Sequence, residues 1–220
     1  MKVRHSFIYK NSLSLVLITL MLVFWAGQFI AGMKTMDEER HENGFPPLSI
    51  IEYAKSGHFI QATFENWESE FLQMAFYVFL TIYLRQKGSS ESKSLYKKEA
   101  VDRAPKIHPK APWPVKRGGL WLKIYSNSLT LVLIILFVCS FFMHFWGSMK
   151  NFNEEQFMKN LPLATASQYF SNSRFWFESF QNWQSEFLAV ATLVLLSIWL
   201  RQKGSPESKP VDAAYGEDAE

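Results

Sequence analysis

Residues 13–33, LSLVLITLMLVFWAGQFIAGM, form an uncharged stretch of 21 residues that decides the fold class. A helix rises about 1.5 Å per residue, so this stretch can cross a hydrocarbon core about 30 Å thick. Residues 129–149, LTLVLIILFVCSFFMHFWGSM, form a second such stretch, in which Cys139 and His144 are the only titratable side chains. Because a similar stretch recurs in mid-chain, where no signal peptide could stand, the first is expected to be retained. The sequence therefore predicts an all-α membrane protein.

Two shorter apolar runs, residues 71–84 and 187–200, contain 14 residues each, which is too few to cross a bilayer unaided. The segments before them, 59–70 and 175–186, contain no Pro or Gly and can extend each helix toward the outer surface. Four transmembrane helices are thus expected, with amphipathic outer-side segments leading into the second and the fourth.

The sequence Leu-Arg-Gln-Lys-Gly ends both of these helices, at 84–88 and at 200–204. Its glycines, Gly88 and Gly204, are expected to take the left-handed C′ conformation that closes many helices. Aromatic and basic side chains at the helix ends are expected to anchor the protein at the membrane interface. These anchors are Trp67, Trp183, Arg85, Lys87, Arg201 and Lys203.

Adding 116 to a residue number maps the first half of the chain onto the second without a gap. FENWESEFL at 64–72 recurs as FQNWQSEFL at 180–188, and RQKGSSESK at 85–93 recurs as RQKGSPESK at 201–209. Each copy contains two spans, so both copies enter the membrane in the same orientation, as two parallel tandem repeats of a helical hairpin. The predicted divisions are a first repeat at 1–93, a Pro- and Lys-rich linker at 94–116, a second repeat at 117–209 and an acidic, disordered tail at 210–220.

Charge is distributed unevenly between the two sides of these spans. Residues 85–123 carry eleven Lys and Arg against three Asp and Glu, whereas residues 34–70 carry three against eight. The positive-inside rule then places both termini and the linker in the cytoplasm and the interhelical loops outside. Residues 106–116 are expected to form an extended tether near anionic lipid headgroups, and no nucleic-acid partner is expected.

The paired NWxSEF and LRQKGSxESK motifs make the chain similar to a family of bacterial membrane proteins that is characterised only as a domain of unknown function. The resemblance runs over nearly the whole chain, including residues 37–39 and 153–155. It implies a location in the bacterial inner membrane. It implies no activity, substrate or catalytic residue.

One polar stripe could carry chemistry in the segments that precede the short apolar runs. Its members lie on one helical face in each copy, and they are Asn66, Ser69, Glu70, Gln73, Asn182, Ser185 and Glu186. A pseudo-twofold axis could bring Glu70 and Glu186 together as a site for a proton or a cation. The alternative is that the stripe faces water at the headgroup level or lines a contact between helices.

His144 and its counterpart Gln28 could form an intramembrane relay, although a position at the outer interface without function explains His144 as well. The acidic cluster near Asp37 could attract a divalent cation, but its composition is typical of a solvated helix start, so no metal site is expected. No catalytic motif and no cofactor motif is present.

The sequence therefore predicts a non-enzymatic structural or interaction module of the cell envelope. A second copy or another membrane protein could be its partner. The alternative function is a small ion- or proton-conducting transporter or channel that uses the Asn-Ser-Glu stripes.

Overall fold

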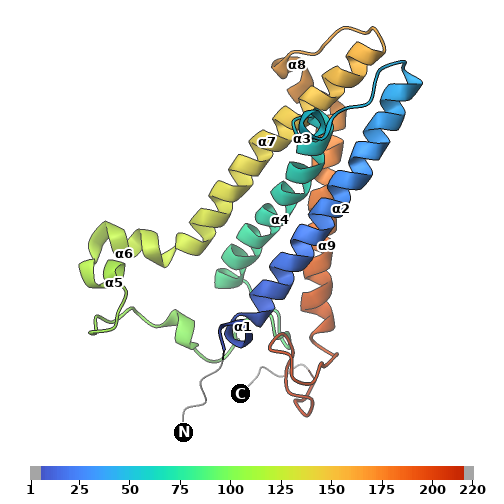
Figure 1. Ribbon diagram of the computed structural model, residues 1–220. Helices are drawn as coiled ribbons and strands as arrows, with labels where there is room; N and C mark the ends of the chain where they lie inside the picture. Colours follow the sequence, from blue (N-terminus) through green and yellow to red (C-terminus); the bar gives the residue numbers. More distant parts are fainter. Residues whose placement is uncertain (1–5, 216–220) are drawn as a thin grey trace. The chain divides into compact units, whose positions relative to one another are not determined.

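The computed structural model describes residues 6–215, a range that contains helices and loops without a strand. Its four long helices are α2 (Ser12–Glu42), α4 (Gly57–Tyr83), α7 (Ser128–Met158) and α9 (Ser173–Leu196) (Figure 1). The shorter elements are α1 (Phe7–Lys10), α3 (Ile50–Ala54), the 3₁₀ helix η1 (Ala100–Asp102), α5 (Trp113–Arg117), α6 (Gly119–Ser126) and α8 (Ala166–Phe170). The predicted all-α class is confirmed. Residues 1–5 of the predicted first repeat and 216–220 of the predicted tail lie outside the described residues.

Two of the described helices, α2 and α7, are long and apolar enough to cross a membrane. Each contains 31 residues, or about 46 Å of helix, and each includes one of the two stretches that open the sequence analysis. The other long helices, α4 and α9, do not meet the same standard of length and hydropathy. Two of the four predicted spans thus meet this standard of length and composition.

The segments before the short apolar runs join them in continuous helices, as predicted. α4 begins at Gly57 and α9 at Ser173, so these helices contain 27 and 24 residues. At 1.5 Å per residue they are about 40 and 36 Å long, which exceeds the thickness of a hydrocarbon core.

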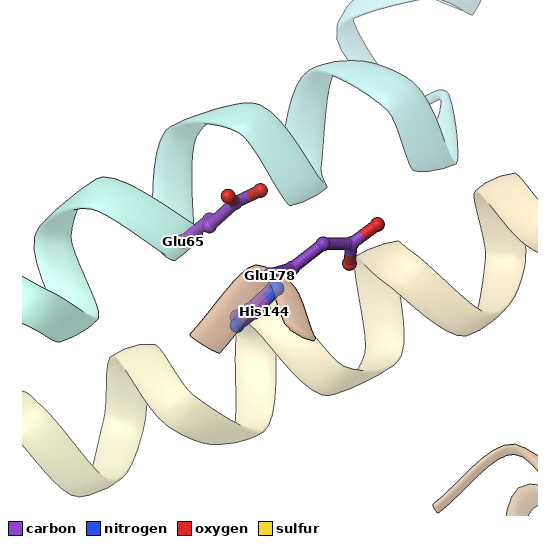
Figure 2. A group of neighbouring side chains, drawn as sticks. All are labelled: Glu65, His144 and Glu178. Atoms are coloured by element: carbon purple, nitrogen blue, oxygen red, sulfur yellow. The ribbon is translucent and has the colours of Figure 1, made fainter. Parts of the chain in front are cut away.

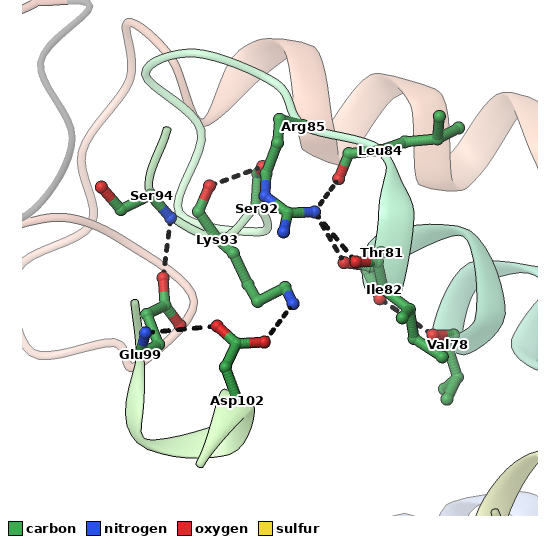
Figure 3. A network of polar contacts seen from close by, with 10 residues as sticks. All are labelled: Val78, Thr81, Ile82, Leu84, Arg85, Ser92, Lys93, Ser94, Glu99 and Asp102. Atoms are coloured by element: carbon green, nitrogen blue, oxygen red, sulfur yellow. Dashed lines mark hydrogen bonds and ion pairs between the residues drawn. The ribbon is translucent and has the colours of Figure 1, made fainter. Parts of the chain in front are cut away.

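The predicted ends of these two helices need a correction. Gly88 and Gly204 have positive φ angles of 84° and 86°, but α4 already ends at Tyr83 and α9 at Leu196, so neither glycine is a C′ residue. An arginine closes each helix instead. Nη1 of Arg85 donates to the carbonyl oxygens of Thr81, Ile82 and Leu84 (Figure 3). Nη1 of Arg201 donates in the same way to Ser197, Ile198 and Leu200.

The linker also differs in part from the extended tether that the sequence predicts. Residues 104–108 are free of regular structure, but α5 begins at Trp113, and Arg117 lies over the rings of Trp113 and Trp121 at 5.2 and 5.5 Å. Such cation–π contacts stabilise a turn that proline-rich composition alone does not indicate.

Contacts divide the chain into two compact units, each of which takes segments from both halves of the sequence. The first comprises residues up to Glu65 together with Phe141–Phe175, and the second comprises Asn66–Ser140 and the residues from Trp176 onward. The first unit has an apolar core of Met36, Tyr53 and Phe59 with Phe29, Met33 and Leu48 packed against it. These units cut across the predicted repeats, whose boundaries stay a prediction.

Within the first unit, local contacts recur at an interval of 116 residues. The amide of Leu48 donates to the Asp37 carboxylate at 2.8 Å, and the amide of Ala164 donates to the Asn153 side-chain oxygen at 2.8 Å. A capping box starts α3 at Ser49 and another starts α8 at Thr165. Equivalent sequence positions therefore make equivalent contacts.

The two RQKGSxESK segments contact each other and the end of α9 within the second unit. The hydroxyls of Ser89 and Ser197 lie 2.7 Å apart, and the Ser90 hydroxyl donates to the carbonyl oxygen of Glu207 at 2.8 Å. Lys93 then ties the first segment to η1 through a 2.6 Å ion pair with Asp102 (Figure 3). These loops are thus folded against one another rather than extended into solvent.

Candidate functional site

The site begins with a close crossing of α4 and α7 in the first unit. A Cβ atom added at Gly57 would lie 2.1 Å from the backbone nitrogen of Asn151, and one added at Gly147 would lie 2.6 Å from that of Gln61. Real Cβ contacts are longer than this, so only glycine fits at either position. Small residues at a crossing let two helix backbones approach closely. The side chains on the facing sides of α4 and α7 are consequently packed closely.

Polar side chains fill this crossing, and we call Gln61 and Glu65 of α4 with His144 and Asn151 of α7 the polar seam. The Asn151 amide donates to the Gln61 side-chain oxygen at 3.0 Å in a buried contact. One turn further along α4, a carboxylate oxygen of Glu65 and a ring nitrogen of His144 lie within 4.8 Å of each other. Figure 2 shows these two side chains on their helices, with Glu178 drawn on α9. The seam therefore ends on a carboxylate and an imidazole.

Aromatic rings surround the imidazole at this end of the seam. His144 has an exposed fraction of 0%, and its ring lies 5.1 Å from the ring of Phe175. Phe175 in turn packs against Phe141 and Phe145, at 5.6 and 5.3 Å between ring centroids. The sequence analysis weighed an interface position for His144, but the structure buries it inside the protein. Gln28, the proposed relay partner, is half-buried on α2.

A second buried carboxylate lies on α4 within the second unit. Glu68 has an exposed fraction of 0% and accepts a hydrogen bond from the indole Nε1–H of Trp183 at 2.8 Å. Trp183 was predicted as an interface anchor, yet its polar atom faces this carboxylate. Trp67 is half-buried, whereas Lys87 and Lys203 are exposed, and the anchoring role of these residues stays a prediction.

The structure separates the members of the predicted Asn-Ser-Glu stripe. Ser69 is buried and donates to the carbonyl oxygen of Asn66 at 2.8 Å, while Asn66 and Glu70 themselves are exposed. Gln73, Asn182 and Glu186 are half-buried and Ser185 is exposed. The charge of Glu70 acts on Glu186, and a shared site for a proton or a cation at these two carboxylates stays a prediction.

Sequence reasoning missed Glu65 and Glu68. Both lie in the FENWESEFL motif, but the stripe chosen there started from Asn66 and so selected a different face of the same helix. Spacing contained a usable signal: Gly57, Gln61, Glu65 and Glu68 follow one another at intervals of four, four and three residues. That pattern puts a glycine and three polar residues on one face.

The family model for a domain of unknown function, DUF6766, matches residues 4–220. No curated protein and no solved structure matches the chain. Because the family model covers almost all of the 220 residues, the chain belongs to the DUF6766 family.

Proposed function

We propose that this chain is an integral membrane protein that handles protons or cations, with the buried polar residues of α4 and α7 as its working groups. All four long helices cross the bilayer in this proposal. Length supports the crossing of α4 and α9, and hydropathy supports that of α2 and α7. The termini and the linker lie in the cytoplasm of a bacterial cell, as the charge asymmetry suggests.

One observation carries this proposal: Glu68 and His144 have no exposed surface, although both lie on helices long enough to cross a membrane. Ionisable side chains are costly inside a bilayer, and those that occur there commonly mark ion pathways or proton relays. A purely structural module has no need of ionisable side chains that are buried on membrane-spanning helices. These two residues supply such groups and shift the balance toward transport.

The tandem copies differ at each of three positions, because a titratable residue in one copy corresponds to a glutamine in the other. The residues 116 positions from Glu65, Glu68 and His144 are Gln181, Gln184 and Gln28. Glutamine has a similar size and can form hydrogen bonds, but it neither titrates nor carries a charge. The duplicated hairpins thus supply a scaffold, and one pair of helices within it supplies the titratable groups.

Flux into liposomes tests the proposal. Purified protein should carry protons or a cation across the membrane, and Glu68→Gln and His144→Gln should each reduce that flux at least about tenfold, since each removes a titratable group from the path. Both variants introduce the residue that the other copy already contains. Glu70→Gln is the matched control because it changes an exposed carboxylate on the same helix.

The absence of flux for all ions tested, from a folded wild-type protein, would overturn the proposal. That result would favour the structural or interaction module, to which one observation also points. The apolar side chains of α2 from Leu13 to Phe24 lie exposed on the first unit and need lipid or a partner to cover them. A flux lost only in Glu70→Gln and Glu186→Gln would instead move the path to the Asn-Ser-Glu stripe.

A further inference from the structure

We propose that Glu65 and His144, at one end of the polar seam, bind a divalent transition-metal ion, represented by Zn²⁺. The inference rests on the proposed function in one respect, because it names the class of cation that the seam would handle. Binding itself requires only the geometry of the first unit.

The distance between the two side chains suits a shared ion. A carboxylate oxygen of Glu65 and a ring nitrogen of His144 lie within 4.8 Å of each other. Zinc binds oxygen and nitrogen ligands at about 2.0–2.2 Å, so two ligands of one ion are separated by at most about 4.4 Å. A small rotation of the glutamate side chain brings both atoms into this range.

The two types of ligand select among cations. An imidazole nitrogen favours zinc and other transition metals, whereas Ca²⁺ and Mg²⁺ are bound almost entirely by oxygen. Phe175 lies against the His144 ring, and such an apolar shell limits the access of water to a bound ion. Water could complete the coordination.

The crossing of α4 and α7 holds these ligands in place. Glu65 lies two turns after Gly57, and His144 lies three residues before Gly147, so each ligand is close to a point where the backbones touch. The hydrogen bond between Gln61 and Asn151 locks the intervening turn. Ligand side chains held on rigid helices lose little conformational entropy when a metal binds, which favours a specific site.

The repeat also predicts the stoichiometry. The position equivalent to Glu65 is Gln181 in the second half, the position equivalent to His144 is Gln28 in the first half, and neither glutamine provides a carboxylate or an imidazole. We therefore expect one site of this type within residues 6–215, and Glu65→Gln or His144→Gln replaces a ligand by a side chain already present at the matching position of the other copy.

Calorimetric titration of the detergent-purified protein with Zn²⁺ tests the inference. The protein should have a Cys139→Ser background, since the free thiol of Cys139 is exposed and could bind zinc, and a purification tag without histidine. We expect one Zn²⁺ per chain, little competition from Mg²⁺ or Ca²⁺, and at least about a tenfold loss of affinity in Glu65→Gln and in His144→Gln. His58→Gln is the matched control, because His58 contacts Tyr53 elsewhere in the first unit.

A wild-type protein that binds no Zn²⁺, or variants that bind it as tightly as the wild type, would overturn the inference. If either variant fails to fold, the visible spectrum of the Co²⁺-loaded wild-type protein tests the site instead. This spectrum should saturate at one equivalent with bands typical of nitrogen and oxygen ligands and should be lost on addition of Zn²⁺, and the absence of such a spectrum counts against the site. Zinc binding without any flux retains this inference and rejects the proposed function, whereas proton flux without zinc binding does the reverse.

Discussion

Tyr53 and Tyr169 occupy matching positions in the two halves of the chain, 116 residues apart, but they have different polar partners. Both are buried, with exposed fractions of 1% and 0%. The Tyr53 hydroxyl shares a 3.0 Å hydrogen bond with Nδ1 of His58 and lies against Gly32. The Tyr169 hydroxyl shares a 2.5 Å hydrogen bond with Ser148, which is the residue equivalent to Gly32. The aromatic position is thus the same in both halves, and its polar surroundings are not.

Position 58 of the first half corresponds to Arg174 in the second. Arg174 forms two 2.8 Å hydrogen bonds with the Glu155 carboxylate, so the second half replaces a titratable imidazole by a fixed ion pair. Titratable groups differ between the halves along the long helices as well, where Glu65 of the first half corresponds to Gln181 and His144 of the second half corresponds to Gln28. The comparison teaches that packing is repeated in the two halves while titratable groups are not.

The largest expected effect comes from replacing Gly32 of the first half by serine, the residue at the equivalent position 148 of the second half. In Gly32→Ser, the new Cβ would lie 2.2 Å from the Tyr53 hydroxyl, so the buried tyrosine must move. We expect a loss of about 3 kcal/mol in the free energy of unfolding, as for other overpacked cores. Unfolding in detergent micelles measures it. Gly27→Ser is the control, because no atom lies within 4 Å of a Cβ there, and equal stability of both variants would contradict the contact.

A smaller loss in the free energy of unfolding is expected when Arg174 of the second half is replaced by histidine, the residue at the equivalent position 58. Arg174→His removes both hydrogen bonds to Glu155, a pair that is only partly exposed, and should cost about 1.5 kcal/mol. Denaturant unfolding at low and high salt is the measurement. The difference from the wild type should shrink as salt rises because ions screen the pair, and a salt-independent difference would point to lost packing.

Acid should weaken the first half through His58. Burial lowers the pKa of His58, against an opposing effect of Glu155 and with a contribution from the Arg174 charge, while burial raises the pKa of the facing Tyr53 to about 12. A depressed pKa gives stability above the unfolded pKa that is lost as the pH falls through the folded pKa. His58→Gln should therefore flatten the dependence of the melting temperature on pH below neutrality. An unchanged slope would show that His58 does not titrate in this range.

The smallest effect, of opposite sign, is expected for Glu91 in the loops of the second unit. Burial raises the pKa of Glu91, and the nearby Glu207 raises it further, whereas the Tyr77 hydroxyl donates to its carboxylate at 2.8 Å and acts against this. A raised pKa gives stability below the unfolded pKa that is lost as the pH rises through the folded pKa. Protease cleavage of the loops should thus become faster in the wild type as the pH rises through the folded-state pKa of Glu91, and it should not do so in Glu91→Gln. Cleavage that is equally pH-dependent in both proteins would exclude Glu91 as the cause.

Much of the helical architecture could be predicted from local pattern. The apolar stretches specify α2 and α7, and the absence of Pro and Gly before the short runs specifies the length of α4 and α9. The polar seam could not be predicted, because Glu65 and His144 are 79 positions apart and meet only where Gly57 and Gly147 let two helices touch. Helical periodicity groups residues into faces but does not say which face is buried, and this is why Glu70 was chosen and Glu68 was overlooked.

The proposed function depends on α4 and α9 crossing the membrane, and labelling of single cysteines in the loops before and after each helix tests this most directly. In a Cys139→Ser background, an impermeant thiol reagent applied to intact cells should label Lys55→Cys and Lys159→Cys. It should reach Lys87→Cys and Lys203→Cys only after the membrane is opened. Labelling of the loops before and after α4, or before and after α9, from the same side would contradict the four crossings and, with them, the membrane pathway.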